Sequence, residues 1–195
     1  MLKINDLSFS YGDKKILNEL SLSLPSKGVY AITGPSGCGK TTLFMLIASL
    51  IKPDSGSIES DHKRLSFVFQ EARLLPWLTA AENVNFALGG KKSTLQNAIE
   101  ELCKVGLSDD TKKYPHELSG GMQRRVSLAR AFAYDGDIIL LDEPTAGLDE
   151  KIKAVVLDMI KEKGEKSLVL MITHDIDEAK ACANEILDFY EIQKG

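Results

Sequence analysis

The residues with the clearest chemical meaning are Gly34–Thr41, whose sequence GPSGCGKT matches the pattern GxxxxGK[ST]. Glycines at these spacings let a loop wrap so that its backbone N–H groups point inward at phosphate oxygens. The Lys40 ammonium would neutralise the outer phosphates of ATP, and the Thr41 hydroxyl would bind Mg²⁺. The residues expected to contact the nucleotide in this segment are Gly34, Pro35, Ser36, Gly37, Cys38, Gly39, Lys40, Thr41 and Thr42.

A chance glycine turn is the alternative explanation of this loop. The four fixed positions match by accident in about one chain of this length in a hundred. The loop also lies between an apolar run, Val29–Thr33, and an expected helix from about Lys40 to Leu50. Because that helix would aim its positive end at the same phosphates, the phosphate-binding interpretation is favoured. A helix terminus could also raise the reactivity of the Cys38 thiol, but a small residue tolerated at a variable position is the favoured explanation.

Two carboxylates, Asp142 and Glu143, follow the apolar run Ile138–Leu141, which predicts a buried strand. Asp142 would hold Mg²⁺, directly or through water. Glu143 would polarise the water that attacks the γ-phosphate. Acids at a strand end are often only solvated, but a pair that follows a phosphate-binding loop in the chain indicates a nucleoside triphosphatase.

The segment Leu118–Gln123, LSGGMQ, narrows the class further. Gly120 and Gly121 would open a helix whose N–H groups suit a γ-phosphate. Because it lies between the phosphate loop and the acidic strand, the segment resembles the signature of the ATP-binding cassette (ABC) ATPases. The resemblance implies nucleotide contacts from Ser119, Gly120, Gly121 and Gln123. A Ser-Gly-Gly loop that only caps a helix is the plainer alternative, and the order of the motifs disfavours it.

Further positions match this family along nearly the whole chain. Gln70, after an expected strand, matches the Q-loop, which binds Mg²⁺ and senses the partner subunit. His174 matches the switch histidine that contacts the γ-phosphate, Tyr11 the aromatic residue that stacks on adenine, and Leu148–Asp149 the D-loop. Taken singly, such residues are usually hydrogen-bonded or packed without a ligand, so these assignments depend on position. The resemblance thus implies a catalytic set of Lys40, Gln70, Glu143 and His174, and a metal set of Thr41, Gln70 and Asp142.

Strand-type and helical segments alternate along the chain, which predicts an α/β fold with a parallel sheet. The expected strands are Leu2–Ile4, Leu7–Tyr11, Leu20–Leu24, Val29–Thr33, Leu65–Phe69, Ile138–Leu141 and Leu168–Ile172, with turns at Gly12–Asp13 and Pro53–Gly56 and a helix near Lys151–Glu162. The resemblance implies a P-loop NTPase (RecA-like) core, an N-terminal antiparallel β-subdomain and an inserted helical subdomain. We expect a single domain over 1–195, in which 1–70 and 134–195 form the core with the β-subdomain and 71–133 form the helical signature subdomain.

The composition is that of an ordinary globular protein. The chain has 195 residues, of which 44% are hydrophobic and 27% charged, and its net charge is −4. This excludes a disordered chain and gives no support to nucleic-acid binding. The three cysteines are widely spaced, and the N-terminus lacks an apolar signal core, so a cytosolic location is expected. The longest apolar run, Leu43–Ile51, is far shorter than the ~20 residues of a membrane span.

A finer resemblance concerns Phe69–Trp77, Ala81–Val84 and Met171–Ala179, which are similar to importer ATPases of the nitrate, sulfonate and taurine group. Thr145 departs from that group, which often has Phe there, and the chain ends 21 residues after His174, where further strands would follow in the group. The resemblance implies a peripheral subunit on the cytoplasmic face of the membrane. Its expected partners are integral-membrane permease subunits and a solute-binding protein.

The family's geometry also implies a homodimer that closes on ATP, because Ser119 of one subunit faces the phosphate loop of the other. Leu74, Leu75 and Trp77 follow Gln70 and suit a docking surface for the permease, although Trp77 could equally pack inside the helical segment. Two other function classes stay open. One is the ATPase of an exporter or lipid-extraction system, and the other is a soluble ABC ATPase without a channel.

Overall fold

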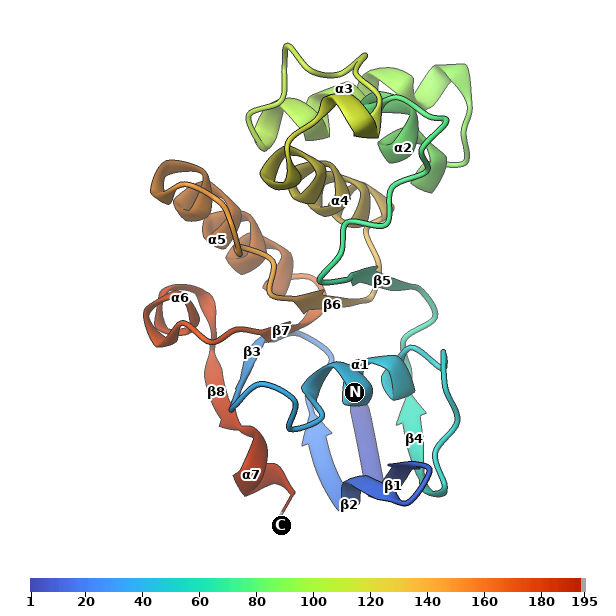
Figure 1. The fold of residues 1–195 in the computed structure, drawn as a ribbon, viewed down its shortest axis with the longest axis vertical. Coiled ribbons are helices and arrows are strands. Elements are labelled where there is room, and N and C mark those ends of the chain that lie inside the picture. The colour runs from blue at the N-terminus through green and yellow to red at the C-terminus, as the bar shows by residue number, and fades with distance from the viewer. Residues whose placement is uncertain (194–195) are drawn as a thin grey trace.

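The computed structural model describes residues 1–193 and contains two sheets and a separate group of helices (Figure 1). The strands are β1 (Leu2–Tyr11), β2 (Lys14–Leu24), β3 (Gly28–Thr33), β4 (Ser55–Ser60), β5 (Leu65–Val68), β6 (Ile138–Asp142), β7 (Leu168–Ile172) and β8 (Glu185–Asp188). The helices are α1 (Lys40–Ile47), α2 (Ala80–Ala87), α3 (Leu95–Lys104), α4 (Gly120–Tyr134), α5 (Glu150–Gly164), α6 (Ile176–Cys182) and α7 (Phe189–Ile192), with short 3₁₀ turns at Lys92–Thr94 and Pro115–Glu117.

The parallel sheet has the order β5-β6-β7-β3-β8 and is covered on both faces. Side chains of a strand alternate between faces, so the fully apolar strands can supply two cores. In β6, Ile138 and Leu140 pack toward α1, while Ile139 and Leu141 pack toward α4, α5 and α6. This explains why the sequence of β6 shows no polar alternation.

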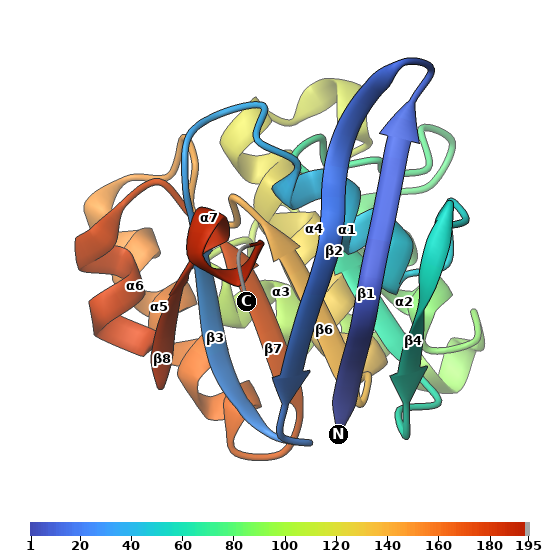
Figure 2. The same cartoon turned by 90° about the horizontal axis from the view of Figure 1, so that it is seen from below.

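The antiparallel sheet has the order β2-β1-β4 and shares its core with α1. Leu7 and Leu20 from this sheet lie in the same buried cluster as Leu43 and Phe44 of α1 and Leu170 of β7. Helix α1 is therefore held between the two sheets, as Figure 2 shows from below. Since α1 begins directly after the phosphate-binding segment, both sheets fix the direction of that segment.

Helices α2, α3 and α4 form a separate hydrophobic core above the parallel sheet (Figure 1). Val84 of α2, Leu102 of α3 and Val126 of α4 are fully buried in it. Helix α2 begins with a capping box, in which Thr79 and Glu82 bind each other's backbone N–H groups. The division of the chain into 1–70 with 134–195 and 71–133 stays our proposal, and residues 194–195 of it lie outside the described residues.

The expected arrangement of elements is confirmed: an α/β core with a parallel sheet, an N-terminal antiparallel sheet and helices inserted between β5 and β6. Two expectations about local structure were wrong or incomplete. Residues 2–11 form one strand, which two bulges bend between Ile4 and Phe9, where two separate runs were expected. The expected turn at Pro53–Gly56 overlaps the start of β4, whose Ser-rich sequence gave no strand signal.

In residues 1–193, no helix combines the length and apolar character that crossing a membrane requires.

Candidate functional site: a nucleotide pocket at the carboxyl edge of the parallel sheet

Gly34–Thr41 wraps the start of α1 as a glycine-dependent loop. Gly37 and Gly39 have φ angles of 74° and 118°, in the region that other residues rarely adopt. A Cβ atom on Gly39 would also lie 2.8 Å from Ile16 Cγ2. Only glycine fits there, so the spacing of glycines in the motif has a direct steric cause.

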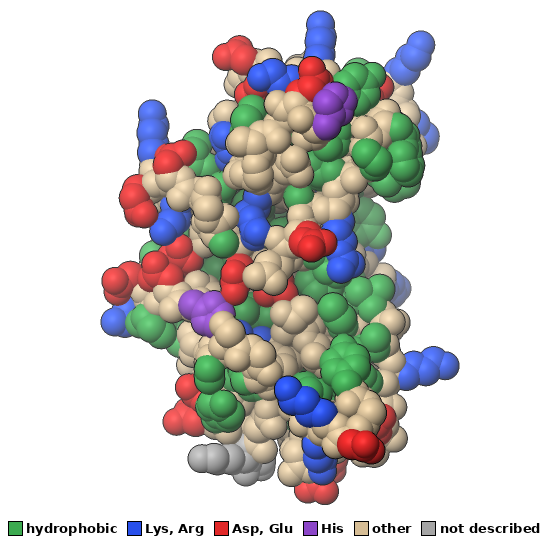
Figure 3. Space-filling model, in the orientation of Figure 1, with side chains coloured by type: hydrophobic (Ala, Val, Ile, Leu, Met, Phe, Trp, Pro, Cys, Tyr) green, Lys and Arg blue, Asp and Glu red, His purple; other side chains and the backbone are tan. Residues whose placement is uncertain are grey.

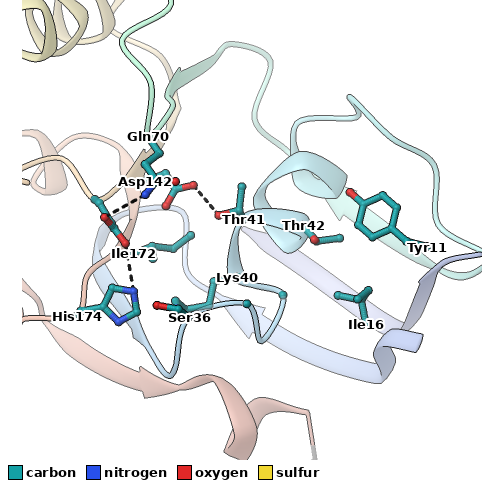
Figure 4. A pocket seen from close by; sticks show the side chains of 13 residues that line it. Tyr11, Ile16, Ser36, Lys40, Thr41, Thr42, Gln70, Asp142, Ile172 and His174 are labelled. Carbon is teal, nitrogen blue, oxygen red and sulfur yellow. Dashed lines mark hydrogen bonds and ion pairs between the residues drawn. The ribbon is translucent and has the colours of Figure 1, made fainter. Parts of the chain in front are cut away.

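A pocket of about 290 Å³ opens beside this loop and holds most of the expected site residues (Figure 4). Its lining contains the expected residues Tyr11, Ser36, Gly37, Gly39, Lys40, Thr41, Thr42, Gln70, Asp142, Glu143 and His174, together with Ile16 and Ile172. Gly34, Pro35 and Cys38 belong to the loop but not to the lining. The sequence analysis missed both isoleucines, because their place depends on how β2 and β7 are paired.

Thr41 and Asp142, the expected Mg²⁺ ligands, touch each other at one side of the pocket. The Thr41 hydroxyl donates to Asp142 Oδ2 over 2.7 Å, although the two residues are 101 positions apart. Burial raises the pKa of the Asp142 carboxyl; Thr41 opposes this rise and the neighbouring Glu143 adds to it. A cation at this place would relieve the unfavourable burial of the negative charge.

Glu143 lies where Gln70 and His174 converge (Figure 4). His174 Nε2 is 3.1 Å from Glu143 Oε1, and Gln70 Nε2 makes a longer contact of 3.5 Å with Oε2. The backbone of Glu143 has a φ angle of 49°, which is left-handed and unusual for a residue with a side chain. This turn directs the carboxylate away from the strand and into the pocket.

Lys40 lines the pocket and is only 5% exposed. Its ammonium donates to the carbonyl oxygens of Gly34 and Pro35 over 2.7 and 2.8 Å. Besides the role expected toward the phosphates, Lys40 therefore has a structural role in its own loop.

Tyr11 stands at the far end of the pocket from His174, beside Ile16 (Figure 4). It is 50% exposed, and its ring packs edge-on against Phe9 with centroids 4.8 Å apart. One face of the ring can therefore receive a flat base, as the sequence-based assignment requires.

The signature segment lies elsewhere. Ser119 and Gly120 are exposed at the start of α4, where the Ser119 hydroxyl caps the helix by accepting from the Met122 N–H. Gly121 lies next to the carbonyl of Gly147. Gln123 donates to the carbonyls of Pro115 and Leu118, so its side chain orders the loop that precedes the helix. The pocket lining within residues 1–193 includes none of these four signature residues.

A buried carboxylate that sequence reasoning missed joins two loops and helix α5 beside the pocket. Glu178 of α6 is 7% exposed and accepts from Thr145 Oγ1 over 2.6 Å and from Thr173 Oγ1 over 3.0 Å. Lys153 of α5 lies 3.1 Å from its other oxygen. Thr145 stands where the importer group often has Phe. In this chain its hydroxyl donates a hydrogen bond to Glu178. The network fixes the residues that follow Glu143 and those that precede His174.

Taken together, a glycine loop before a helix and two acids at the neighbouring strand end define a P-loop nucleoside triphosphatase. The ABC transporter family profile matches residues 17–146. The taurine import ATP-binding protein TauB of Escherichia coli is 40% identical over 202 aligned residues, which cover 96% of this chain and 78% of that protein. The aliphatic sulfonates import ATP-binding protein SsuB 1 of Mesorhizobium japonicum is 37% identical over 187 residues, with 91% and 71% covered.

Solved structures agree with this family match. An ATP-binding cassette described as a dimer in a post-hydrolysis state, bound to ADP and Pi, superposes with a TM-score of 0.89 at 30% identity, covering 96% of this chain and 94% of that one. The chain therefore belongs to the ABC transporter family, and it is an ATP-binding and ATP-hydrolysing cassette.

Replacing Lys40 by Ala is predicted to lower ATP turnover by about 10²–10³-fold, because no other group in the loop supplies positive charge to the outer phosphates. Turnover is measured as phosphate release by the purified chain. Lys52→Ala, which removes an exposed lysine after α1, is the matched control and should keep normal turnover. A folded Lys40→Ala protein that hydrolyses ATP at the normal rate would contradict the assignment.

Proposed function

We propose that this chain is the ATP-hydrolysing subunit of an importer for small sulfonates, bound to a permease at the cytoplasmic face of the membrane. The observation that carries the proposal is the convergence of Thr41 with Asp142, and of Gln70 and His174 with Glu143, on one pocket. The solute class and a solute-binding protein as a further partner are supported by the relatives, which are named for the import of taurine and aliphatic sulfonates.

The chain's own residues account for each requirement of hydrolysis. Lys40 exchanges its loop carbonyls for the β- and γ-phosphates, and Glu143 orients the attacking water. His174, held at 3.1 Å from Glu143, faces the same γ-phosphate position. Gln70 follows the end of β5 and responds to whether a nucleotide is bound in the pocket.

Mg²⁺ fits the oxygens of Thr41 and Asp142, and Gln70 lines the same pocket. These are the hard donors that Mg²⁺ prefers, and it commonly completes its shell with phosphate oxygens and water. Within residues 1–193, no group of three or more acidic, His or Cys side chains could hold a metal alone. When bound, Mg²⁺ supplies positive charge to the β- and γ-phosphates.

We propose further that two copies close on two ATP molecules. The pocket of one chain contains the phosphate loop and the acids but lacks Ser119, Gly120 and Gly121, which present helix N–H groups at an exposed position. A two-fold arrangement places the signature of each copy over the pocket of the other. ATP favours closure because it binds the closed state better.

Glu143→Gln is predicted to bind ATP, fail to hydrolyse it and accumulate as a dimer at micromolar concentration. The substitution preserves the shape of the side chain but removes its charge. Light scattering after size-exclusion chromatography with MgATP measures the mass. The double variant with Ser119→Arg is the control and should stay monomeric, because the added bulk blocks closure. A Glu143→Gln chain that binds ATP but remains monomeric, alone and with the permease, would contradict the mechanism.

The proposed permease surface surrounds Trp77. This side chain is 69% exposed, which argues against its packing inside the helical segment. Asn83 is fully buried and binds the backbone of Leu75, Leu78 and Thr79, so the loop that carries Trp77 is held rigidly. Figure 3 shows hydrophobic side chains gathered in this region, over α2.

An apolar groove of about 380 Å³ lies beside this loop, between β5, α2 and α4. Phe86 and Tyr134 on its walls are 63% and 38% exposed, and Leu75 and Phe67 contribute further apolar surface. Exposed apolar patches of this kind mark interaction sites. Leu74, in contrast, packs against the helical core, so the three apolar residues expected to act together have different environments.

Trp77→Ala is predicted to weaken capture of the permease by at least about 10-fold. Basal ATP turnover should stay within about twofold, because Trp77 is not among the residues that line the pocket. Co-purification of the tagged chain from membranes measures the first and phosphate release the second. Leu50→Ala, at another exposed apolar site, is the control. Unchanged capture, or identification of a non-membrane partner, would contradict the docking proposal.

Deleting the gene is predicted to abolish growth on taurine or a short alkanesulfonate as the sole sulfur source, without affecting growth on sulfate. The reason is that transport stops when the ATPase is lost. Complementation should succeed with the natural chain and fail with Lys40→Ala. Normal growth of the deletion strain on sulfonates, with uptake of labelled sulfonate unchanged, would refute the proposed solute class.

A further inference from the structure

Two arginines of α4 bind the backbone of the segment that follows β5. The Arg130 guanidinium donates to the carbonyls of Ala72 and Arg73 over 3.1 and 3.0 Å. The Arg124 guanidinium donates to the carbonyl of Gln70 with one nitrogen. With its other nitrogen it donates over 2.6 Å to the carbonyl of Glu143, which belongs to a different loop. Arg124 alone of this pair therefore joins α4 to both nucleotide-facing loops.

The Glu143 contact has a specific effect on backbone conformation. Glu143 is in the left-handed region, which disfavours residues with a Cβ atom, and surrounding contacts must maintain it. Its N–H donates to the carbonyl of Ile172 over 3.0 Å, and its own carbonyl accepts from Arg124. The two peptide groups that flank this residue are thus held by β7 and by α4, and the Ala146 N–H makes a longer bond of 3.3 Å to the same carbonyl as Arg124.

The charge of Arg124 suits this position. Burial lowers the pKa of the guanidinium, while the nearby carboxylates of Glu143 and Asp142 raise it. Arginine stays charged under such conditions, and its planar fork can serve two acceptors at once. A lysine ammonium lacks that fixed fork geometry.

We propose that Arg124 is a positioning residue that ties the signature helix to Gln70 and Glu143, so that a displacement of α4 moves both groups relative to the γ-phosphate. The inference rests on the proposed roles of Gln70 and Glu143. Arg124 lies just over one helical turn after the exposed Ser119, in the same helix. A contact made at the signature is therefore transmitted along α4 to the loops that carry Gln70 and Glu143. Arg124 itself is not among the residues that line the pocket.

The test compares Arg124→Met with Arg130→Met in the full chain. Each variant removes one guanidinium that serves two carbonyls and keeps an apolar stem of similar length. Arg124→Met is expected to lower kcat for ATP at least 10-fold, with KM and the affinity for ATP changed less than threefold. Arg130→Met is expected to keep kcat within about twofold, while the thermal midpoints of both variants fall by a similar few degrees.

Arg124→Lys extends the test in case Arg124→Met folds poorly. One ammonium can serve one carbonyl fully, so kcat should lie between those of Arg124→Met and the natural chain. Equal loss of kcat in Arg124→Met and Arg130→Met, or a normal kcat in a folded Arg124→Met and Arg124→Lys, would overturn the inference. Glu143→Gln in the same assay distinguishes a failure of the Arg124 inference from a failure of the proposed function. If Glu143→Gln hydrolyses ATP normally, the proposed role of Glu143 is wrong.

Discussion

The register of the parallel sheet determines where all the reactive groups lie. Strand β7 is hydrogen-bonded to β6 on one side and to β3 on the other, and Ile172 is opposite Asp142 in the first pairing and Ile32 in the second. Parallel strands end at the same edge of a sheet, so the residues that follow these three strands emerge together. The phosphate loop, Glu143 and His174 become neighbours for this reason. A shift of β7 by one residue would turn its core side chains to the opposite face and separate the loops.

The helical part depends on the core through side chains that bind backbone. The segment from Gln70 to Thr79 has no regular structure, and an irregular segment must satisfy its polar groups by other means. Arg124 and Arg130 bind its first residues, and the buried Asn83 binds its last. The connection between the two parts is consequently well defined at both ends, although it contains no helix or strand.

Much of this arrangement could be predicted from the sequence, because some constraints are local. The glycine spacing of the phosphate loop follows from backbone angles, and the apolar runs of β6 and β7 follow from burial on two faces. Other features depend on which distant segments become neighbours. Ile16 reaches the pocket through the pairing of β2, and Glu178 finds Thr145 across 33 residues. Arg124 had the sequence appearance of an ordinary charged helix residue, and only the positions of two carbonyls 54 and 19 residues away distinguish it.

The internal bonds of Lys40 have a consequence for selectivity. Its ammonium binds the carbonyls of Gly34 and Pro35 in place of water, so part of its desolvation and ordering comes from folding. An incoming molecule competes with two neutral dipoles rather than with bulk solvent. A multiply charged phosphate chain wins that exchange readily, because opposite charges attract more strongly than a charge and a neutral carbonyl dipole. A neutral metabolite offers little advantage over the carbonyls. The loop therefore selects for highly charged ligands, independently of any contact between Tyr11 and a nucleobase.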